Sequence, residues 1–154
     1  MDSIGEIVNL TAVPYGNAQI DTTTQTVTCQ HGDAECSANV YEQCGIALNP
    51  DQVPLAPPSR HPPHSPSDAP PPRGNQAAWF PFYNCVEEAA GGEGGEVTED
   101  DVQTCATTAG VDGDAIVACH DDPDEAWAMQ LAASQATDPD HEYTPWVVVG
   151  GTPP

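Results

Sequence analysis

Six cysteines are the side chains of this chain that are most able to do chemistry. They are Cys29, Cys36, Cys44, Cys85, Cys105 and Cys119. An even number of cysteines in a chain of 154 residues is typical of a disulfide framework formed in an oxidising compartment. Paired cysteines can stabilise a fold, or they can exchange with other thiols if one of them forms a reactive thiolate. The sequence alone does not fix which cysteines pair.

Metal binding is the second chemistry open to these residues. Four side chains carry the sulfur and imidazole atoms that bind zinc: Cys29, His31, Cys36 and Cys44. Zinc ligands usually come in close pairs along the sequence, and these four are not spaced in that way. The acidic runs Glu99–Asp101 and Asp121–Glu125 lack the spaced ligands of a calcium loop, and they fit helix N-termini better. We therefore expect no metal site and no cofactor, and free thiols remain a further alternative to disulfides.

The charge of the chain excludes several classes of partner. Asp and Glu number 24 against two basic residues, both arginine, so the formal net charge is -22 at pH 7. Nucleic acids and anionic membrane surfaces are recognised by clustered basic side chains, so we expect neither as a partner. No apolar run approaches the roughly 18 residues of a membrane span. The N-terminal residues also lack the basic and apolar regions of a signal peptide.

A proline-rich stretch divides the chain. Residues 50–72 hold 10 of the 17 prolines. Proline at this density prevents helices and sheet ladders, so we expect a disordered insert over residues 49–77. A retained intron and a true insertion would both explain it. The remaining parts, residues 1–48 and 78–154, belong to the folded protein.

The first of these parts is predicted to form strands and a helix. The apolar run Ile7–Val13, which Pro14 ends, is rich in β-branched residues and predicts a buried strand. Thr22–Thr28 alternates in side-chain type and predicts a second extended segment. Apolar residues then recur every three or four positions over Asp33–Cys44, which predicts a short helix with Asp33 as its N-cap.

The second part is predicted to be mostly helical. Thr98 and Asp101 resemble a capping box at the start of a helix that ends at Gly110. Further helices are expected around Ala115–Cys119 and over Glu125–Ala136. The inward-facing residues of the last helix would be Trp127, Leu131 and Ala132.

The strongest strand signal of the chain is the triplet Val147–Val149. It follows Pro145 and ends at a pair of glycines, Gly150 and Gly151. Strands near both ends with helices between them predict an α/β fold. Aromatic residues make up only 6% of the chain, so we expect a modest hydrophobic core.

The most specific motif of the sequence spans Cys29 to Cys44 and reads CQHGDAECSANVYEQC. It matches the pattern C-Q-H-G-x2-E-C-x2-N-x4-C at every fixed position. These positions are Cys29, Gln30, His31, Gly32, Glu35, Cys36, Asn39 and Cys44. The motif resembles the signature of the gamma-interferon-inducible lysosomal thiol reductase family. The segments Asn9–Gln19 and His141–Val149 are similar to two further stretches of that family.

This resemblance implies a thioredoxin-like fold with a helical insertion, of which the chain looks like the central part, truncated at both ends. The family reduces disulfide bonds of proteins in acidic lysosomes. Disulfide-bonded proteins and a small thiol reductant are therefore the implied partners, and the implied location is lysosomal or secreted.

The redox pair of the family is a C-x-x-C at a helix N-terminus, where the helix dipole stabilises a thiolate. No two cysteines of this chain have that spacing. The resemblance places the pair upstream of Met1, so we expect no catalytic residue within the chain.

Two other sites follow from the resemblance. Thioredoxin-like folds carry a cis-proline that faces the redox pair and the substrate, and Thr144 and Pro145 are similar to that element. Passage through the secretory route makes Asn9, in the sequon Asn9-Leu10-Thr11, a candidate for glycosylation.

The family keeps its other cysteines apart from the redox pair, which favours structural disulfides in this chain. The candidate pairs are Cys29 with Cys44 or Cys36, and Cys105 with Cys119 or Cys85. An alternative function is a non-catalytic binding module that is secreted, acidic and held together by disulfides. An upstream C-x-x-C preceded by a signal peptide would distinguish the enzyme from the binding module.

Overall fold

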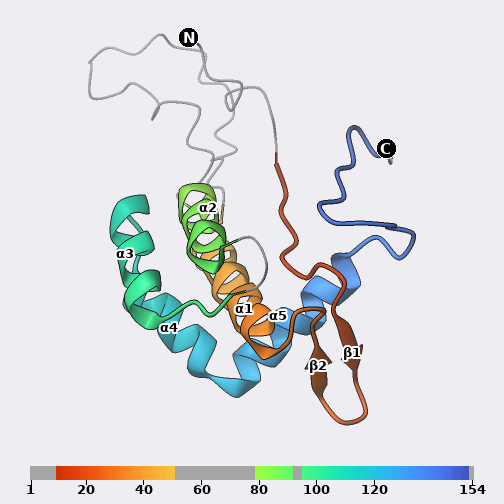
Figure 1. Ribbon diagram of the computed structural model, residues 1–154, viewed down its shortest axis with the longest axis horizontal. Coiled ribbons are helices and arrows are strands. Elements are labelled where there is room, and N and C mark those ends of the chain that lie inside the picture. Colours follow the sequence, from red (N-terminus) through yellow and green to blue (C-terminus); the bar gives the residue numbers. More distant parts are fainter. Residues whose placement is uncertain (1–9, 51–78, 92–94, 153–154) are drawn as a thin grey trace, which may run out of the picture.

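The computed structural model describes residues 10–50, 79–91 and 95–152. The glycosylation candidate Asn9 and nearly all of the proline-rich insert lie outside these residues. The elements are β1 (Gln19–Asp21), β2 (Thr26–Thr28), α1 (Asp33–Leu48), α2 (Trp79–Ala90), α3 (Glu99–Ala109), α4 (Gly113–Asp121) and α5 (Pro123–Ala136). Figure 1 shows a group of helices with a small hairpin at one side. The described part is therefore mixed α/β, as the sequence predicts, while the thioredoxin-like arrangement stays a prediction.

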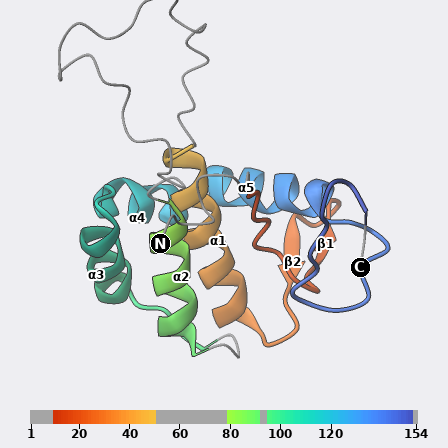
Figure 2. The ribbon, with the colours of Figure 1, turned by 90° about the horizontal axis from the view of Figure 1, so that it is seen from above.

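Helix α1 is the centre of the helical part. It packs against α2, α4 and α5, and α3 packs against α2 and α4. Figure 2 shows α1 and α2 side by side, with α3 at the end of the row. The largest apolar side chains that are fully buried here are Phe82, Ile116, Val86 and Val102. None of the described helices has the length and hydropathy that are needed to cross a membrane.

Helices α1 and α2 approach each other closely at Gly45. A Cβ atom at this position would lie 2.5 Å from two ring carbons of Phe82. Real atoms do not approach so closely, so packing requires glycine here. The missing side chain lets the aromatic ring fill the space between the two helices.

The ends of α3 and α5 follow the capping signals of the sequence. Thr98 accepts a hydrogen bond from the Asp101 N–H, and the Asp101 carboxylate accepts one from the Thr98 N–H. This is the predicted capping box, and its hydrogen bonds from Thr98 hold the pKa of Asp101 below its usual value. Gly110 then ends α3 with a left-handed φ of 74°. Asp122 caps α5, and Pro123 is the first residue of that helix.

Strands β1 and β2 form an antiparallel hairpin. The prediction of an extended segment over Thr22–Thr28 is correct only for its second half, Thr26–Thr28, because the first half forms the turn. The Asp21 carboxylate accepts hydrogen bonds from the N–H groups of Thr23 and Thr24 at 2.8 and 3.2 Å. These bonds lower the pKa of Asp21 and close the turn in the way that is common for aspartate.

Two strand predictions are wrong for the residues that the structure describes. Leu10–Val13 is irregular, and Val147–Val149 contributes only an isolated bridge from Val149 to Thr152. The three valine residues are 59, 44 and 76% exposed. A strand needs a neighbour to pair its N–H and C=O groups, and the described sheet consists of β1 and β2 alone. An apolar, β-branched sequence therefore does not become a strand here.

Helix α5 buries a different face from the one predicted. Gln130 and Ala133 are buried, Trp127 and Leu131 are half-buried, and Ala132 is exposed. The helix contacts α1, α4 and β1. Its buried face is centred on a polar residue, which a pattern of apolar residues cannot reveal.

Candidate functional site

All six cysteines form disulfides. The pairs are Cys29–Cys36, Cys44–Cys119 and Cys85–Cys105. The first and third pairs are among the candidates from the sequence, and the second is not. The second pair joins α1 to α4, and the third joins α2 to α3. Since every cysteine sulfur is bonded to another sulfur, Cys29, Cys36 and Cys44 are not thiolates that could bind zinc.

The signature begins with a turn that leads into α1. Gly32 occupies the N-cap position with a φ of 94°, in the region that favours glycine, so the prediction of Asp33 as the N-cap is wrong. Gly32 has no side chain that could accept a hydrogen bond from the first turn. Glu35 reaches back instead, and its Oε2 accepts the backbone N–H of His31 at 2.7 Å. These motif residues therefore act together to start the helix.

The Cys29–Cys36 disulfide lies at the junction of the hairpin and α1. Cys29 precedes the turn, and Cys36 is in the first turn of α1, where its N–H donates to the Gly32 carbonyl at 3.3 Å. Asn39 lies about one turn further along the helix, and its Nδ2 donates a long hydrogen bond of 4.0 Å to Cys29 Sγ. Cys36 Sγ lies 4.0 Å from the carbonyl oxygen of Val27 on β2. The disulfide thus ties the hairpin to the start of α1.

Asn17 joins the signature to the C-terminal segment. Its Nδ2 donates to Gln30 Oε1 at 2.7 Å, and its Oδ1 lies 3.1 Å from His141 Nε2. The other ring nitrogen of His141, Nδ1, lies 2.6 Å from the carbonyl oxygen of Asp138. Asn17 and His141 therefore link the signature to the segment that follows α5.

Thr144 and Pro145 lie close to the signature. Their peptide bond is cis, the form that the resemblance implies. Gly16 lies between them and the signature, since a Cβ atom there would be 4.0 Å from Thr144 Cγ2 and 3.6 Å from Glu35 Oε1. Figure 2 shows the C-terminal segment beside the hairpin. The three family-like stretches, which are far apart in the sequence, therefore meet at one end of the molecule.

A shallow depression lies at the base of the hairpin. It is lined by Asn17, Gln19, Thr28, Cys29 and Gln30. The lining combines amide and hydroxyl groups with one cysteine of the signature disulfide. Among the described residues, no group of His, Cys, Asp and Glu side chains could hold a metal ion.

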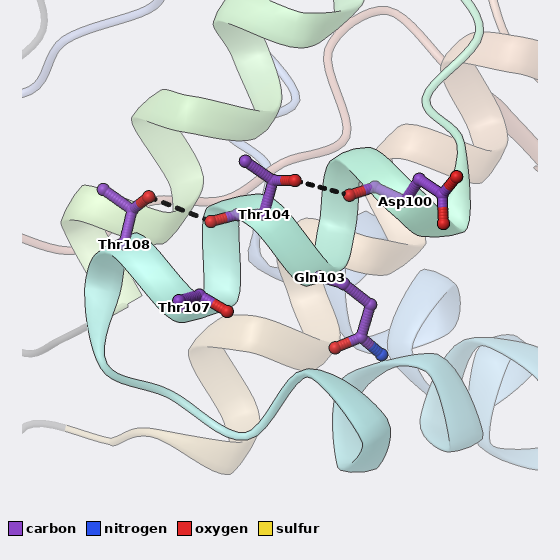
Figure 3. A pocket seen from close by; sticks show the side chains of 5 residues that line it. All are labelled: Asp100, Gln103, Thr104, Thr107 and Thr108. Atoms are coloured by element: carbon purple, nitrogen blue, oxygen red, sulfur yellow. Dashed lines mark hydrogen bonds between the residues drawn. The ribbon is translucent and has the colours of Figure 1, made fainter.

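A second depression lies on the outer face of α3 (Figure 3). Its lining residues are Asp100, Gln103, Thr104, Thr107 and Thr108. The hydroxyls of Thr104 and Thr108 donate to backbone carbonyls one turn earlier, at 2.8 and 2.9 Å. Gln103 donates to Asp114 on α4 at 2.9 Å. These donors are satisfied within the protein, so they do not indicate a ligand site.

No motif marks His120, although it makes three specific contacts. Its ring stacks on Tyr41 at a centroid distance of 3.7 Å. Its Nε2 lies 2.8 Å from Ser37 Oγ, and its Nδ1 lies 2.8 Å from Asp121 Oδ1. The series Ser37, His120 and Asp121 has the order of residues in the catalytic triad of a serine hydrolase. However, Ser37 lies within α1, where helix hydrogen bonds occupy the backbone N–H groups that an oxyanion hole would use. We therefore interpret these contacts as the docking of α4 on α1.

Two buried glutamines hold α5 and the segment before β1 against α1. Gln43 Nε2 donates to the Pro14 carbonyl at 2.5 Å and to Gln130 Oε1 at 3.4 Å. Gln130 Nε2 in turn donates to the Cys36 carbonyl at 3.2 Å. The sequence gives no signal for this pair, because buried amides leave no periodic pattern.

Glu42 is a buried carboxyl on α1 that the motif also does not mark. It is only 3% exposed. Burial, and then the negative charge of Glu87, raise its pKa to about 9. The Tyr83 hydroxyl donates to Glu87 Oε1 at 2.9 Å, and burial and the same two carboxyls raise the pKa of Tyr83. Glu42 is therefore protonated at neutral pH.

Comparisons with known proteins bear on the family. The family model described as gamma interferon inducible lysosomal thiol reductase (GILT) matches residues 1–109. The chain is 31% identical over 160 residues to the gamma-interferon-inducible lysosomal thiol reductase of Mus musculus, and 28% identical over 151 residues to that of Carassius auratus. It is also 29% identical over 150 residues to the gamma-interferon-responsive lysosomal thiol protein of Arabidopsis thaliana.

These alignments cover 96% of the chain and 49 to 50% of each relative. The chain therefore spans about half the length of the curated relatives that it matches. The family model covers well over half of the chain and includes the whole signature, Cys29–Cys44. The chain belongs to the gamma-interferon-inducible lysosomal thiol reductase family.

Proposed function

We propose that this chain is part of a thiol–disulfide oxidoreductase that reduces disulfide bonds of proteins in an acidic lysosomal or secretory compartment. Membership of the family, shown by the match over residues 1–109, carries this proposal. The names of the relatives from Mus musculus and Carassius auratus describe lysosomal thiol reductases. Three disulfides in a short chain also suit an oxidising route to the final compartment.

In this proposal the chain is a fragment, and the reactive C-x-x-C pair lies outside it. Every cysteine of the chain is already in a disulfide, and no two of them have the C-x-x-C spacing. By resemblance to thioredoxin-like domains, Thr144 and Pro145 would face the substrate beside that pair. The residues that the structure describes would then supply the scaffold and part of the substrate surface.

The reaction itself follows ordinary thiol–disulfide exchange. The thiolate of the first cysteine attacks one sulfur of the substrate disulfide, and the other substrate sulfur leaves as a thiolate and takes a proton. The second cysteine then attacks the mixed disulfide, which releases the fully reduced substrate and oxidises the pair. Two small thiols return the pair to the dithiol form and are themselves oxidised to one small disulfide.

Reduction of insulin at acidic pH, with dithiothreitol as the electron source, tests this proposal. The chain alone should not raise the rate above that of dithiothreitol alone. Protein made from a reading frame that is extended upstream should contain a C-x-x-C pair and turn over insulin. Replacement of either cysteine of that pair by serine should abolish the activity. Robust turnover by the chain alone would overturn the proposed role, and an extended frame without the pair would favour the non-catalytic binding module.

A further inference from the structure

The three disulfides of the chain have different surroundings. Cys44, Cys105 and Cys119 are 0, 2 and 4% exposed and belong to the hydrophobic core between the helices. Cys36, in contrast, is half-buried at the start of α1, and Cys29 lines the shallow depression at the base of the hairpin. Cys85 is half-buried as well, but its partner Cys105 is a core residue and their bond joins α2 to α3. The signature disulfide differs from the other two because it closes an exposed turn and does not join two helices.

We propose that the Cys29–Cys36 disulfide is a second thiol–disulfide exchange site, which small thiols reduce while the two core disulfides stay oxidised. This site is separate from the C-x-x-C pair proposed above and does not depend on it. A small thiol is the fitting partner of this disulfide because Cys36, the sulfur that it attacks, is half-buried and Cys29 is only 6% exposed. The sulfur of a folded protein substrate could not approach it closely.

The chain around this disulfide can open without disturbing the core. The two cysteines are seven residues apart, and the turn between them contains Gln30, His31 and Gly32, which are all exposed. Separation of the two sulfurs therefore requires movement of an exposed turn. Separation of Cys44 from Cys119 would require α1 and α4 to part, which is an unfolding event.

The contacts of the two sulfurs favour the thiolates that exchange requires. Asn39 Nδ2 lies 4.0 Å from Cys29 Sγ and can donate to it. Cys36 lies in the first turn of α1, where the helix dipole stabilises negative charge. The acids of the same turn, Asp33 and Glu35, act in the opposite direction. The contact from Asn39 is therefore the one that we test.

Reduction of the pair consumes two small thiols. The thiolate of the first attacks Cys36 Sγ, the bond to Cys29 breaks, and Cys29 leaves with the electron pair and then takes a proton. The thiolate of the second attacks the small-molecule sulfur of the mixed disulfide, so Cys36 leaves and is protonated in its turn. The protein gains two thiols, and the two small thiols are oxidised to one small disulfide.

Graded reduction of the native chain with 2-mercaptoethanol tests the proposal. This reagent is uncharged, so the strongly negative protein does not repel it as it would an anionic thiol. Free thiols are trapped with N-ethylmaleimide at each time point, and the labelled peptides are identified by mass. Cys29 and Cys36 should be labelled about tenfold faster or more than the other four cysteines, because their release moves an exposed turn, whereas release of either other pair parts two packed helices. Equal rates for all six, or faster labelling of a core pair, would overturn the proposal.

A charge at position 39 provides the specific test of the thiolate contact. Asn39→Asp keeps the shape of the side chain but places a negative charge beside Cys29, so labelling of the pair should slow by about tenfold. The matched control is Asn84→Asp, which adds the same charge on an exposed site of α2, where Asn84 donates a hydrogen bond to Glu88. The control should leave the rate within about twofold of the wild type.

The core cysteines report whether each variant is still folded. Their labelling should stay slow in both variants, which shows that the helical part is intact while the signature disulfide is probed. If Asn39→Asp exposes the core cysteines as well, Asn39→Ala is measured in its place and should slow the pair by a smaller factor. An unchanged rate for the pair in a folded Asn39 variant would contradict the assigned contact. Loss or gain of insulin turnover would bear only on the function proposed earlier.

Discussion

The two ends of helix α1 are held in different ways. Its C-terminal half lies in the helical core, where Gly45 packs under Phe82 and Cys44 is bonded to Cys119. Its N-terminal end is held by a disulfide across a short turn, by Glu35 and by a chain of polar side chains. Burial of apolar surface is insensitive to small movements, whereas hydrogen bonds are directional. The C-terminal half of α1 is therefore fixed by the core, whereas the position of its N-terminal end depends on a few individual bonds.

Removal of the disulfide at the core end should have the largest effect on stability. The Cys44–Cys119 bond closes 75 residues, and the Cys29–Cys36 bond closes seven. Loop entropy assigns about 4–5 kcal/mol to the first and about 2–3 kcal/mol to the second. The double variant Cys44→Ala/Cys119→Ala should therefore lose more free energy of unfolding in urea than Cys29→Ala/Cys36→Ala. Equal losses would mean that the two ends of α1 are held equally.

The core end should also depend on pH through Glu42. The pKa of its carboxyl is about 9 in the folded protein and near 4.5 in the unfolded chain. Between these two pH values the folded state holds a proton that the unfolded state has lost. Glu42 therefore makes its full contribution to the free energy of unfolding only below about pH 4.5. Stability should fall as the pH rises from there towards 9. Urea titrations over this range should show the slope, and Glu42→Gln should flatten it.

Glu99→Gln is a matched control for this pH dependence, because Glu99 is an exposed acid of α3. It should leave the slope unchanged. A wild-type chain whose stability rises between pH 5 and 8 would contradict the protonated, buried state of Glu42.

A methyl group at Gly45 should separate packing from helix propensity. Alanine is the better helix former by about 1 kcal/mol, but its Cβ would overlap the Phe82 ring. Overpacking of this kind costs about 1–3 kcal/mol, so Gly45→Ala should destabilise the protein on balance. The pair Gly45→Ala/Phe82→Leu should recover part of the loss in a double-mutant cycle. Strictly additive losses in the free energy of unfolding would show that a side chain at position 45 does not clash with Phe82.

The smallest expected effect is at the signature end. Asn17→Ala removes the hydrogen bond to Gln30 and the contact with His141, which should cost about 1 kcal/mol. The loss should be local. Amide hydrogen exchange should quicken in the turn at residues 29–32 and around 138–146, while α2 and α3 keep their protection. A uniform loss of protection would mean that this end is part of the cooperative core.

The sequence allowed much of the helical part to be predicted, because the signals there are local. Thr98, Asp101 and Gly110 mark the ends of α3 through hydrogen bonds and a backbone angle that nearby residues determine. The eight fixed residues of the signature also identify the family without any knowledge of the fold. Two of the three disulfides are among the candidate pairs, but the sequence did not decide between each pair and its alternative.

Features that depend on distant partners could not be predicted. Val147–Val149 has the composition of a strand, but pairing is a property of two segments and cannot be read from one. The burial of Glu42, Gln43 and Gln130 depends on which helices face each other. The Cys44–Cys119 bond was missed because it requires α4 to lie across α1, and no spacing in the sequence expresses that arrangement.

The signature places Cys36 and Cys44 eight residues apart on one continuous helix. This spacing corresponds to about 12 Å of rise and a little over two turns. One inserted residue between them would rotate the far end by about 100°, and Cys36 could no longer face the hairpin while Cys44 faces α4. The spacing of the motif thus fixes the faces of α1 on which the two cysteines lie, and with them the directions of the Cys29–Cys36 and Cys44–Cys119 disulfides.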